Sequence, residues 1–209
     1  MMAVSKFYRF YIAELLSARV VSHARRFVQP AFDGNREAAF SLAVALENQE
    51  RGRVAVAMWQ AKIPRNAFRI FLDAVWLQDH AYVIAEAGSR RRLAAMFKYA
   101  DFASQYPDHG PEQIWRGAHG IGLSHAASGY SWTTDRDVAC WFASRSLTRN
   151  PLVVSCIVQH SEISFRSDDR RESEVVLLVK PKKVFVDGTQ DDWLAGYARF
   201  QEKKLANLG

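Results

Sequence analysis

Two glutamates, Glu172 and Glu174, stand one residue apart at the start of an apolar segment, "RRESEVVLLV". In an extended chain, residues two apart point to the same face, so the pattern predicts two carboxylates side by side. Carboxylates at that spacing raise each other's cost of ionisation. The pair is suited to cleaving a bond at the anomeric carbon of a sugar, because one carboxylate stabilises positive charge while the other handles a proton.

Two further polar groups lie on predicted strands before this pair. Arg116 interrupts the apolar segment "IWRGA", and an arginine in such a strand needs an anionic partner or an exposed face. Ser131 and Thr133 in "GYSWTTD" share one strand face, where their hydroxyls could hold a carboxylate in place. Each residue alone is compatible with an ordinary surface or strand-end position. The three groups together, in this order, point to a catalytic site.

An arginine, then a Ser-x-Ser/Thr strand leading into a helix, then Glu-x-Glu opening an apolar strand, resembles the Arg-Ser-Glu class of mono-ADP-ribosyltransferases. The resemblance covers residues 114–186. It implies an α+β fold in which an ADP-ribosyltransferase-like split β-sandwich holds NAD, the co-substrate, in a cleft with helices in front. The middle motif here reads Ser-Trp-Thr rather than Ser-Thr-Ser, and it follows Arg116 by 15 positions, a shortened interval.

The resemblance assigns roles to the matching residues. Arg116, with Gly117 beside it, would bind the phosphate or ribose of NAD through its planar fork of donors. Ser131 would hold Glu174 in place, and Thr133 would support that strand. Glu174 would bind the nicotinamide ribose and stabilise the positive charge of the transition state.

Acceptor contacts are expected next to the glutamate pair. Glu172 would take the proton from the acceptor. The segment 160–171 immediately precedes the pair and would face the acceptor, with Phe165 stacking on it and Arg170 and Arg171 contacting it. The aromatic ring that stacks on nicotinamide stays open among Tyr130, Trp132 and Phe142, of which Phe142 also fits a core position.

Basic residues are concentrated in the first half of the chain. Residues 1–110 carry 15 Lys and Arg against 10 Asp and Glu, whereas residues 111–209 carry 13 against 12. A basic half could attract a phosphate backbone, and the cluster Arg90, Arg91 and Arg92 is its best local contact. The alternative is a solvated helical surface that is basic without a partner.

The sequence changes from helical patterns to short extended segments near "YPDHGPEQ", where proline and glycine cluster. We therefore predict an N-terminal helical region, 1–110, and an ADP-ribosyltransferase-like β-rich catalytic core, 111–209. Capping-box patterns at Thr134 and Thr189 predict two helices within the core. The helices expected in the first region cover residues 5–28, 36–50, 65–87 (closed by Gly88) and 89–102, with "VAVAMWQA" undecided between helix and strand.

Several other kinds of site are not predicted. The segment "GAHGIG" lacks the following helix of a dinucleotide fingerprint, and no nucleophile elbow is present. Cys156 and His160 have no second pair to complete a zinc site, so no metal is expected. Two cysteines without a framework, no clean signal peptide and no membrane-length apolar run predict a cytoplasmic protein that needs no membrane.

These features predict a NAD-dependent mono-ADP-ribosyltransferase. The pattern also resembles intracellular bacterial toxins of toxin–antitoxin and phage-defence systems, including a phage-defence toxin that modifies messenger RNA, so an antitoxin would be a partner. Charge favours RNA as acceptor, and protein arginine comes next because glutamate at position 172 is typical of arginine acceptors. Two alternatives stay open: NAD glycohydrolysis, with water as the acceptor, and a non-enzymatic module that binds nucleic acid.

Overall fold

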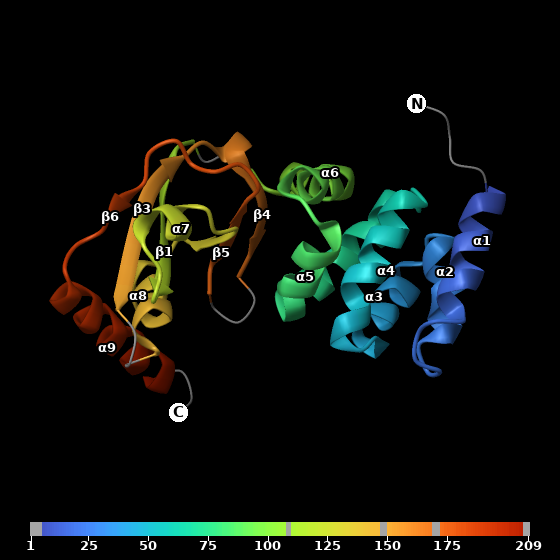
Figure 1. Cartoon of the computed structure of the whole chain (residues 1–209), viewed down its shortest axis with the longest axis horizontal. Helices are drawn as coiled ribbons and strands as arrows, with labels where there is room; N and C mark the ends of the chain where they lie inside the picture. The colour runs from blue at the N-terminus through green and yellow to red at the C-terminus, as the bar shows by residue number, and fades with distance from the viewer. Residues whose placement is uncertain (1–5, 108–109, 147–149, 169–171, 207–209) are drawn as a thin grey trace. The chain divides into compact units, whose positions relative to one another are not determined.

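The chain divides into two compact units, Met1–Phe102 and Ala103–Gly209 (Figure 1). The computed structural model describes residues 6–107, 110–146, 150–168 and 172–206. The first unit is helical and the second combines helices with a sheet, so the protein belongs to the α+β class. Within the described residues, none of the helices has the length and apolar character needed to cross a membrane.

Helices make up the described part of the first unit, and each of them turns apolar side chains into the interior. Phe32, Phe68 and Phe71 are fully buried there, and Phe97 meets Trp76 edge to face with 4.9 Å between ring centroids. Such aromatic contacts add specific geometry to the area that is removed from water. The helices are α1 (Lys6–Ser17), α2 (Arg25–Phe32), α3 (Arg36–Ala45), α4 (Asn48–Gln60), α5 (Arg65–Ala87) and α6 (Arg90–Ala100).

Glu50 accounts for two helix boundaries that differ from the expected ones. The single helix predicted over residues 5–28 is wrong, because α1 ends at Ser17 and the Val21 backbone N–H donates to Glu50 Oε1 at 3.1 Å. The continuous helix over 36–50 is also wrong, because Glu47 and Glu50 form a capping box that starts α4. The undecided segment "VAVAMWQA" lies mainly in α4, and Gly88 (φ 69°) ends α5 as predicted.

Within its described residues, the second unit contains one six-stranded antiparallel sheet in the order β4-β5-β2-β1-β3-β6. β1 and β3 are paired along their whole length, whereas β1 and β2 are joined by a single register pair, Trp115 with Thr133. The sheet therefore has two three-stranded halves with a narrow connection between them. The strands are β1 (Glu112–His119), β2 (Ser131–Thr133), β3 (Pro151–Val158), β4 (Ile163–Ser167), β5 (Glu174–Leu177) and β6 (Phe185–Val186).

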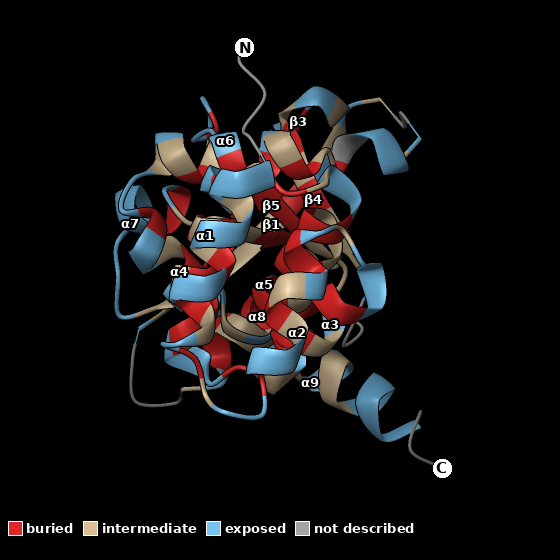
Figure 2. Cartoon of the chain, turned by 90° about the vertical axis from the view of Figure 1, so that its right-hand side faces the viewer, coloured by how far each residue is buried: buried red, intermediate tan, exposed pale blue. Residues whose placement is uncertain are grey.

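Helices cover both faces of the β1–β3 half. Ala126 of α7 (Leu123–Ala127) packs with Ile114 and Val154 on one face. On the other face, α8 (Arg136–Ser144) and α9 (Gln190–Ala206) pack on β3, so buried residues occupy both sides of the strands. Figure 2 colours the chain by burial, with buried residues red. Two short 3₁₀ turns, η1 (Ala103–Gln105) and η2 (His160–Glu162), complete the unit.

The two predicted helix starts have different outcomes. Thr189 and Asp192 form reciprocal hydrogen bonds ahead of α9, which confirms that capping box. The capping box at Thr134 is wrong, because Asp135 is the N-cap of α8 and accepts from the Asp137 N–H at 2.8 Å. The Thr134 N–H instead donates to the Ser173 carbonyl at 3.1 Å and fixes the segment before β5.

Candidate functional site

Arg116 lies near the middle of β1 and reaches across to β2. Its Nη1 donates to the backbone carbonyl of Ser131, and its Nε is buried without a hydrogen-bond partner among the described residues. Burial lowers the pKa of Arg116, and the charge of Glu174 acts in the opposite direction. Because a guanidinium stays protonated in proteins, this is a buried cation with incomplete hydrogen bonding and a carboxylate within electrostatic range.

Gly129 explains how the guanidinium fits beneath the segment that leads into β2. A Cβ atom at position 129 would lie 2.2 Å from Arg116 Cζ and 2.2 Å from Nε. Any larger residue would have to displace the guanidinium, so the absence of a side chain at 129 is a steric requirement for the position of Arg116. Sequence reasoning missed Gly129, because only the contact in the fold distinguishes it from an ordinary turn glycine.

Ser131 and Glu174 lie on neighbouring strands, with Thr133 directly opposite Glu174 in the β2–β5 register. The Thr133 hydroxyl is buried and saturated: it donates to the Glu172 carbonyl at 2.7 Å and accepts from the Asp135 N–H at 3.0 Å. The Ser131 Oγ is buried and has no hydrogen-bond partner among the described residues. The expected hydrogen bond from Ser131 to Glu174 is therefore not formed in this structure.

If side chains alternated strictly between the two faces of the sheet, Arg116 would lie on the face opposite Ser131 and Glu174. Trp115, Thr133 and Glu174 are in register across β1, β2 and β5, so Arg116 starts on the opposite face, beside Ile114. The single pair between β1 and β2 leaves the strands free to diverge, and the long side chain contacts the β2 backbone rather than the far side of the sheet. The Arg116 guanidinium therefore contacts Ser131 because its side chain is long, and not because the two residues are paired in the sheet.

The Glu-x-Glu segment is not extended, so that prediction is wrong. Ser173 has φ 44°, a left-handed conformation that costs a non-glycine residue about 1 kcal/mol, and β5 begins only at Glu174. Hydrogen bonds from Thr133 Oγ1 to the Glu172 carbonyl and from the Thr134 N–H to the Ser173 carbonyl hold this conformation. Both glutamates are half-buried, but Glu172 does not continue the ladder of β5.

Several predicted contact residues are core residues instead. Phe165 lies on β4 opposite Val176 and is 2% exposed, so it is not available to stack on an acceptor, and the expected acceptor loop contains a paired strand. Trp132 is also 2% exposed, in the cluster around Ile114, and its indole N–H donates to the Gly129 carbonyl at 3.2 Å. Burial in well-packed interiors excludes both rings from ligand contact.

Gly117 and Phe142 mark the contact between β1 and α8. A Cβ at Gly117 would lie 1.9 Å from the Ala139 carbonyl oxygen, so this glycine allows the helix to approach the strand rather than a cofactor to approach. Phe142 is half-buried, contacts Trp141 with 4.7 Å between ring centroids and has the Arg145 guanidinium 4.8 Å from its ring. Tyr130, half-buried between Gly129 and Ser131, is the nicotinamide-stacking candidate nearest Arg116 in the chain.

The remaining predicted residues lie apart from this cluster or outside the description. Arg170 and Arg171 lie outside the described residues. Arg90, Arg91 and Arg92 open α6 in the first unit, where Ser89 caps the helix by accepting from the Arg92 N–H at 3.2 Å. No group of three or more His, Cys, Asp or Glu side chains is placed to hold a metal within the described part of the chain.

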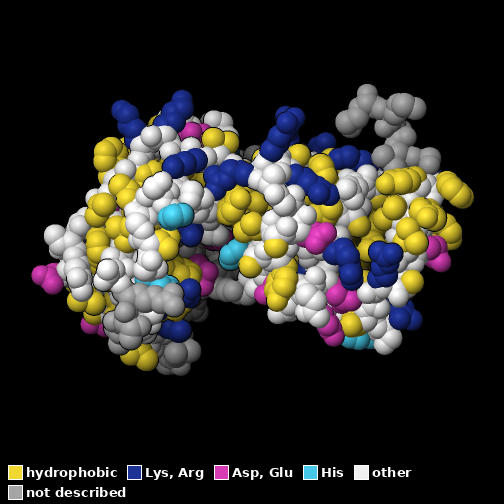
Figure 3. Space-filling model, in the orientation of Figure 1, with side chains coloured by type: hydrophobic (Ala, Val, Ile, Leu, Met, Phe, Trp, Pro, Cys, Tyr) yellow, Lys and Arg dark blue, Asp and Glu magenta, His cyan; other side chains and the backbone are white. Residues whose placement is uncertain are grey.

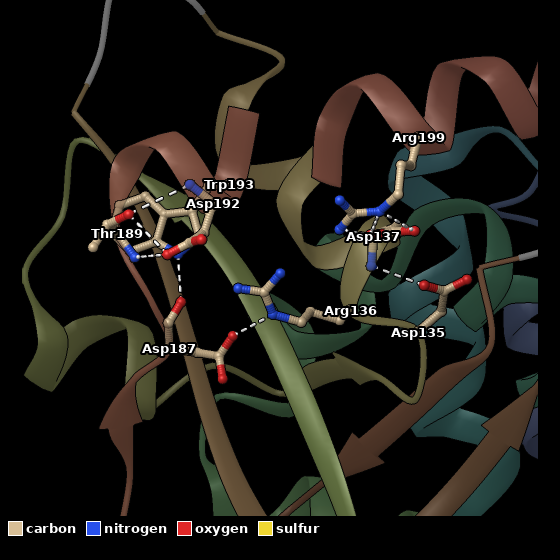
Figure 4. A network of polar contacts seen from close by, with 8 residues as sticks. All are labelled: Asp135, Arg136, Asp137, Asp187, Thr189, Asp192, Trp193 and Arg199. Atoms are coloured by element: carbon tan, nitrogen blue, oxygen red, sulfur yellow. Dashed lines mark hydrogen bonds and ion pairs between the residues drawn. The ribbon is translucent and has the colours of Figure 1, made fainter. Parts of the chain in front are cut away.

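Polar contacts also link α8 with α9 and with the segment before α9 in the same unit (Figure 4). Asp137 accepts from Arg199 at 2.7 Å and from Lys203 at 3.0 Å, and so ties α9 to α8. Burial by itself raises the pKa of Asp137, but these hydrogen bonds outweigh it and leave that pKa below its ordinary value. Arg136 binds Asp187 at 2.6 Å, which fixes the segment before α9.

The cysteines are structural residues. Burial raises the pKa of Cys140 to about 11 and that of Cys156 to about 12, so neither forms the thiolate that a nucleophile requires. The cysteines therefore add no nucleophile to Arg116, Ser131 and the two glutamates, which stay the candidate residues.

Comparison with known proteins gives no match: no protein-family model, no curated protein and no solved structure is significantly similar to this chain.

Proposed function

We propose that the chain is a NAD-dependent mono-ADP-ribosyltransferase with a split β-sandwich, acting inside the cell on a macromolecular acceptor. The observations that carry the proposal are the contact of the Arg116 guanidinium with the β2 backbone and the electrostatic effect of Glu174, on β5, on that same group. The narrow connection between β1 and β2 supports the split sheet that the proposal requires.

The unsatisfied atoms of the cluster suit NAD. Arg116 Nε and Ser131 Oγ are buried polar atoms without partners among the described residues, and such atoms carry a desolvation cost that a polar ligand can offset. Arg116 would bind a phosphate or ribose oxygen, and Ser131 would donate to the ligand or to Glu174. NAD supplies the ADP-ribosyl group, because its bond to nicotinamide breaks and nicotinamide leaves with the electron pair.

The glutamates divide the remaining chemistry. Glu174 would bind the hydroxyls of the nicotinamide ribose and stabilise positive charge at the anomeric carbon as the bond breaks. Glu172 would accept the proton that the acceptor loses as it forms the new bond to that carbon. RNA is the preferred acceptor and protein arginine the next, and an antitoxin protein is the expected partner of a toxin with this activity.

Hydrolysis of NAD is the second candidate, and one observation favours it. The left-handed Ser173 takes Glu172 out of the β5 ladder, and deprotonation of a macromolecular acceptor is the role that depends most on the position of Glu172. Water needs no docking surface, and its activation depends less on the position of the Glu172 carboxylate. The two reactions share Glu174, and they differ in where the ADP-ribosyl group is found.

The test is the fate of NAD labelled in its adenylate phosphate, incubated with the full chain and with RNA or protein. Label on a macromolecule supports the transferase, and free ADP-ribose alone supports the hydrolase. Glu174→Gln keeps size and hydrogen bonding but removes the charge, and we expect turnover to fall by about 10²–10³-fold with an unchanged circular dichroism spectrum. Undiminished turnover by this variant, or no cleavage by the wild type, would reject the proposal.

A further inference from the structure

The first unit carries a continuous series of cations and aromatic rings that the strand cluster does not use. Lys62 Nζ lies 4.3 Å from the centroid of Trp59 and 4.7 Å from that of Tyr99. At the two ends, Arg92 Cζ lies 5.7 Å from the Trp59 ring and Arg65 Cζ lies 5.9 Å from the Tyr99 ring. We call this series, in the order Arg92, Trp59, Lys62, Tyr99 and Arg65, the cation–aromatic ladder.

Three helices position the ladder. Trp59 lies in the last turn of α4, Arg65 is the first residue of α5, and Arg92 and Tyr99 lie on α6. Lys62 follows α4 with φ 49°, a left-handed conformation that directs the chain sharply toward α5. The Tyr99 hydroxyl donates to the Ile63 carbonyl at 2.6 Å and fixes the ring between the two cations. The Tyr99 ring is therefore held in place before any ligand arrives.

The charges of the ladder are only partly compensated. Arg65 pairs with Asp101 at 3.2 Å, but within the described residues no carboxylate lies within 4.0 Å of Lys62 or Arg92. Burial lowers the pKa of Lys62. Arg91, next to Arg92 in the chain, adds an exposed charge, and Lys and Arg side chains gather around α6 on the face shown in Figure 3.

This combination fits one class of partner. Single-stranded nucleic acid offers a phosphate for each cation and an unpaired base for each ring, whereas a duplex keeps its bases stacked inside. An acidic peptide would use the charges but not the rings. Trp59 and Tyr99 are both half-buried rather than core residues.

We propose that the cation–aromatic ladder binds single-stranded nucleic acid, with phosphates on Arg92, Lys62 and Arg65 and bases against Trp59 and Tyr99. As a description of the acceptor this inference rests on the proposed function, since it names single-stranded RNA as the molecule that is brought to the enzyme. The binding itself requires neither NAD nor catalysis, so the two proposals can fail separately.

The experiment measures fluorescence anisotropy of a labelled single-stranded RNA of mixed sequence with the full chain, without NAD, over a range of salt concentrations. For single strands, each phosphate contact adds about 0.7 to the slope of log affinity against log salt. The double variant Lys62→Gln/Arg92→Gln should lose about 1.4 of that slope and bind about 10-fold or more weakly at low salt. Trp59→Leu should bind about 5- to 100-fold more weakly, with less change in slope.

The matched control is Arg25→Gln/Arg26→Gln, which removes the same charge from exposed positions of α2, including the cation over Phe27. It should bind RNA as the wild type does. Equal weakening by this control, equal affinity for a duplex of the same length, or equally effective competition by polyglutamate would overturn the inference. Label transfer from NAD to protein by a chain that does not bind RNA would also overturn it while leaving the transferase proposal in place.

Discussion

The second unit contains two clusters in which arginine and carboxylate meet, and they differ in how completely their atoms are bonded. In the cluster around Asp137, both carboxylate oxygens accept hydrogen bonds, from Arg199 and from Lys203. In the cluster around Arg116, the guanidinium Nε and the Ser131 Oγ are buried without partners among the described residues. Similar residue types thus produce one saturated cluster and one that retains bonding capacity.

The difference indicates what each cluster contributes. Buried polar groups that are fully bonded hold elements together, and Asp137 holds α9 against α8. Buried polar groups that lack partners cost stability and are found where a ligand completes them. Stability and function should therefore respond in opposite ways to substitutions in the two clusters.

The largest effect is expected from Arg116→Met. Turnover of NAD should fall by about 10²–10³-fold, since the guanidinium that we propose binds the phosphate is lost. The free energy of unfolding should not fall, because replacing an incompletely paired buried charge with an apolar side chain of similar size is often neutral or stabilising. Urea unfolding and initial rates measure the two quantities, with the exposed Lys183→Met as the control that keeps both. A large loss of stability in Arg116→Met would assign Arg116 to the framework.

Two hydroxyls of β2 allow the comparison to be made within one strand. Ser131→Ala should lower turnover by about 10-fold or more and leave the unfolding free energy nearly unchanged, because its hydroxyl has no partner to lose. Thr133→Val should destabilise the protein by about 1–2 kcal/mol, since its hydroxyl makes two hydrogen bonds. Chemical denaturation and steady-state rates for both variants would decide the matter, and equal destabilisation would remove the distinction between the two hydroxyls.

Asp137→Asn should lower the unfolding free energy by about 1–2 kcal/mol while activity per folded molecule is kept. The figure is at the low end for a buried carboxylate because Arg199 and Lys203 are 49% and 57% exposed in their side chains. The exposed Asp191→Asn is the control and should change stability by about 0.5 kcal/mol or less. A shift in the urea midpoint equal to that of the control would show that the Asp137 cluster is dispensable.

The effect of pH on the stability of the wild type and of Asp137→Asn tests the direction of the Asp137 pKa shift. The pKa of Asp137 is lowered in the folded protein, so its contribution is fully present above the unfolded value of about 3.9 and is lost as pH falls through the folded pKa. The difference in unfolding free energy between the wild type and Asp137→Asn should therefore shrink as the pH is lowered below about 4. A difference that grows in acid would contradict the assigned hydrogen bonds.

The smallest effect is expected at Ser173. Ser173→Gly should stabilise the fold by about 0.5–1 kcal/mol, because glycine adopts the left-handed conformation without a Cβ clash. Ser173→Ala retains the Cβ and should give no such gain. A destabilised glycine variant in thermal or urea unfolding would show that the serine side chain itself is required at this turn.

Local sequence patterns predicted the elements whose residues interact mainly with their chain neighbours. The helical spacing of 65–87 and Gly88 identified the two ends of α5 but not its kink at Asp79 (φ −148°, ψ 50°), and Thr189 with Asp192 identified the start of α9. Boundaries set by distant residues were not predictable in this way. Where the first predicted helix is interrupted, between α1 and α2, the Val21 N–H donates to Glu50, 29 positions away.

The candidate site shows the same limit. Arg116, Ser131 and Glu174 were chosen by residue type and order, and the strands that carry them are neighbours in the sheet. The conformation of Ser173 depends on hydrogen bonds from Thr133 and Thr134, and the role of Gly129 depends on contact with Arg116. Phe165 resembled a surface aromatic in the sequence because pairing with β5 cannot be read from its immediate neighbours.

The most direct test of the account is the release of nicotinamide from NAD by the full chain without any acceptor, compared with Glu174→Gln under the same conditions. Both the transferase and the hydrolase require this bond to break, so the wild type should release nicotinamide and the variant should do so at least about 10²-fold more slowly. A wild type that releases none, or a variant that releases it at the wild-type rate, would contradict the assignment of this cluster to NAD.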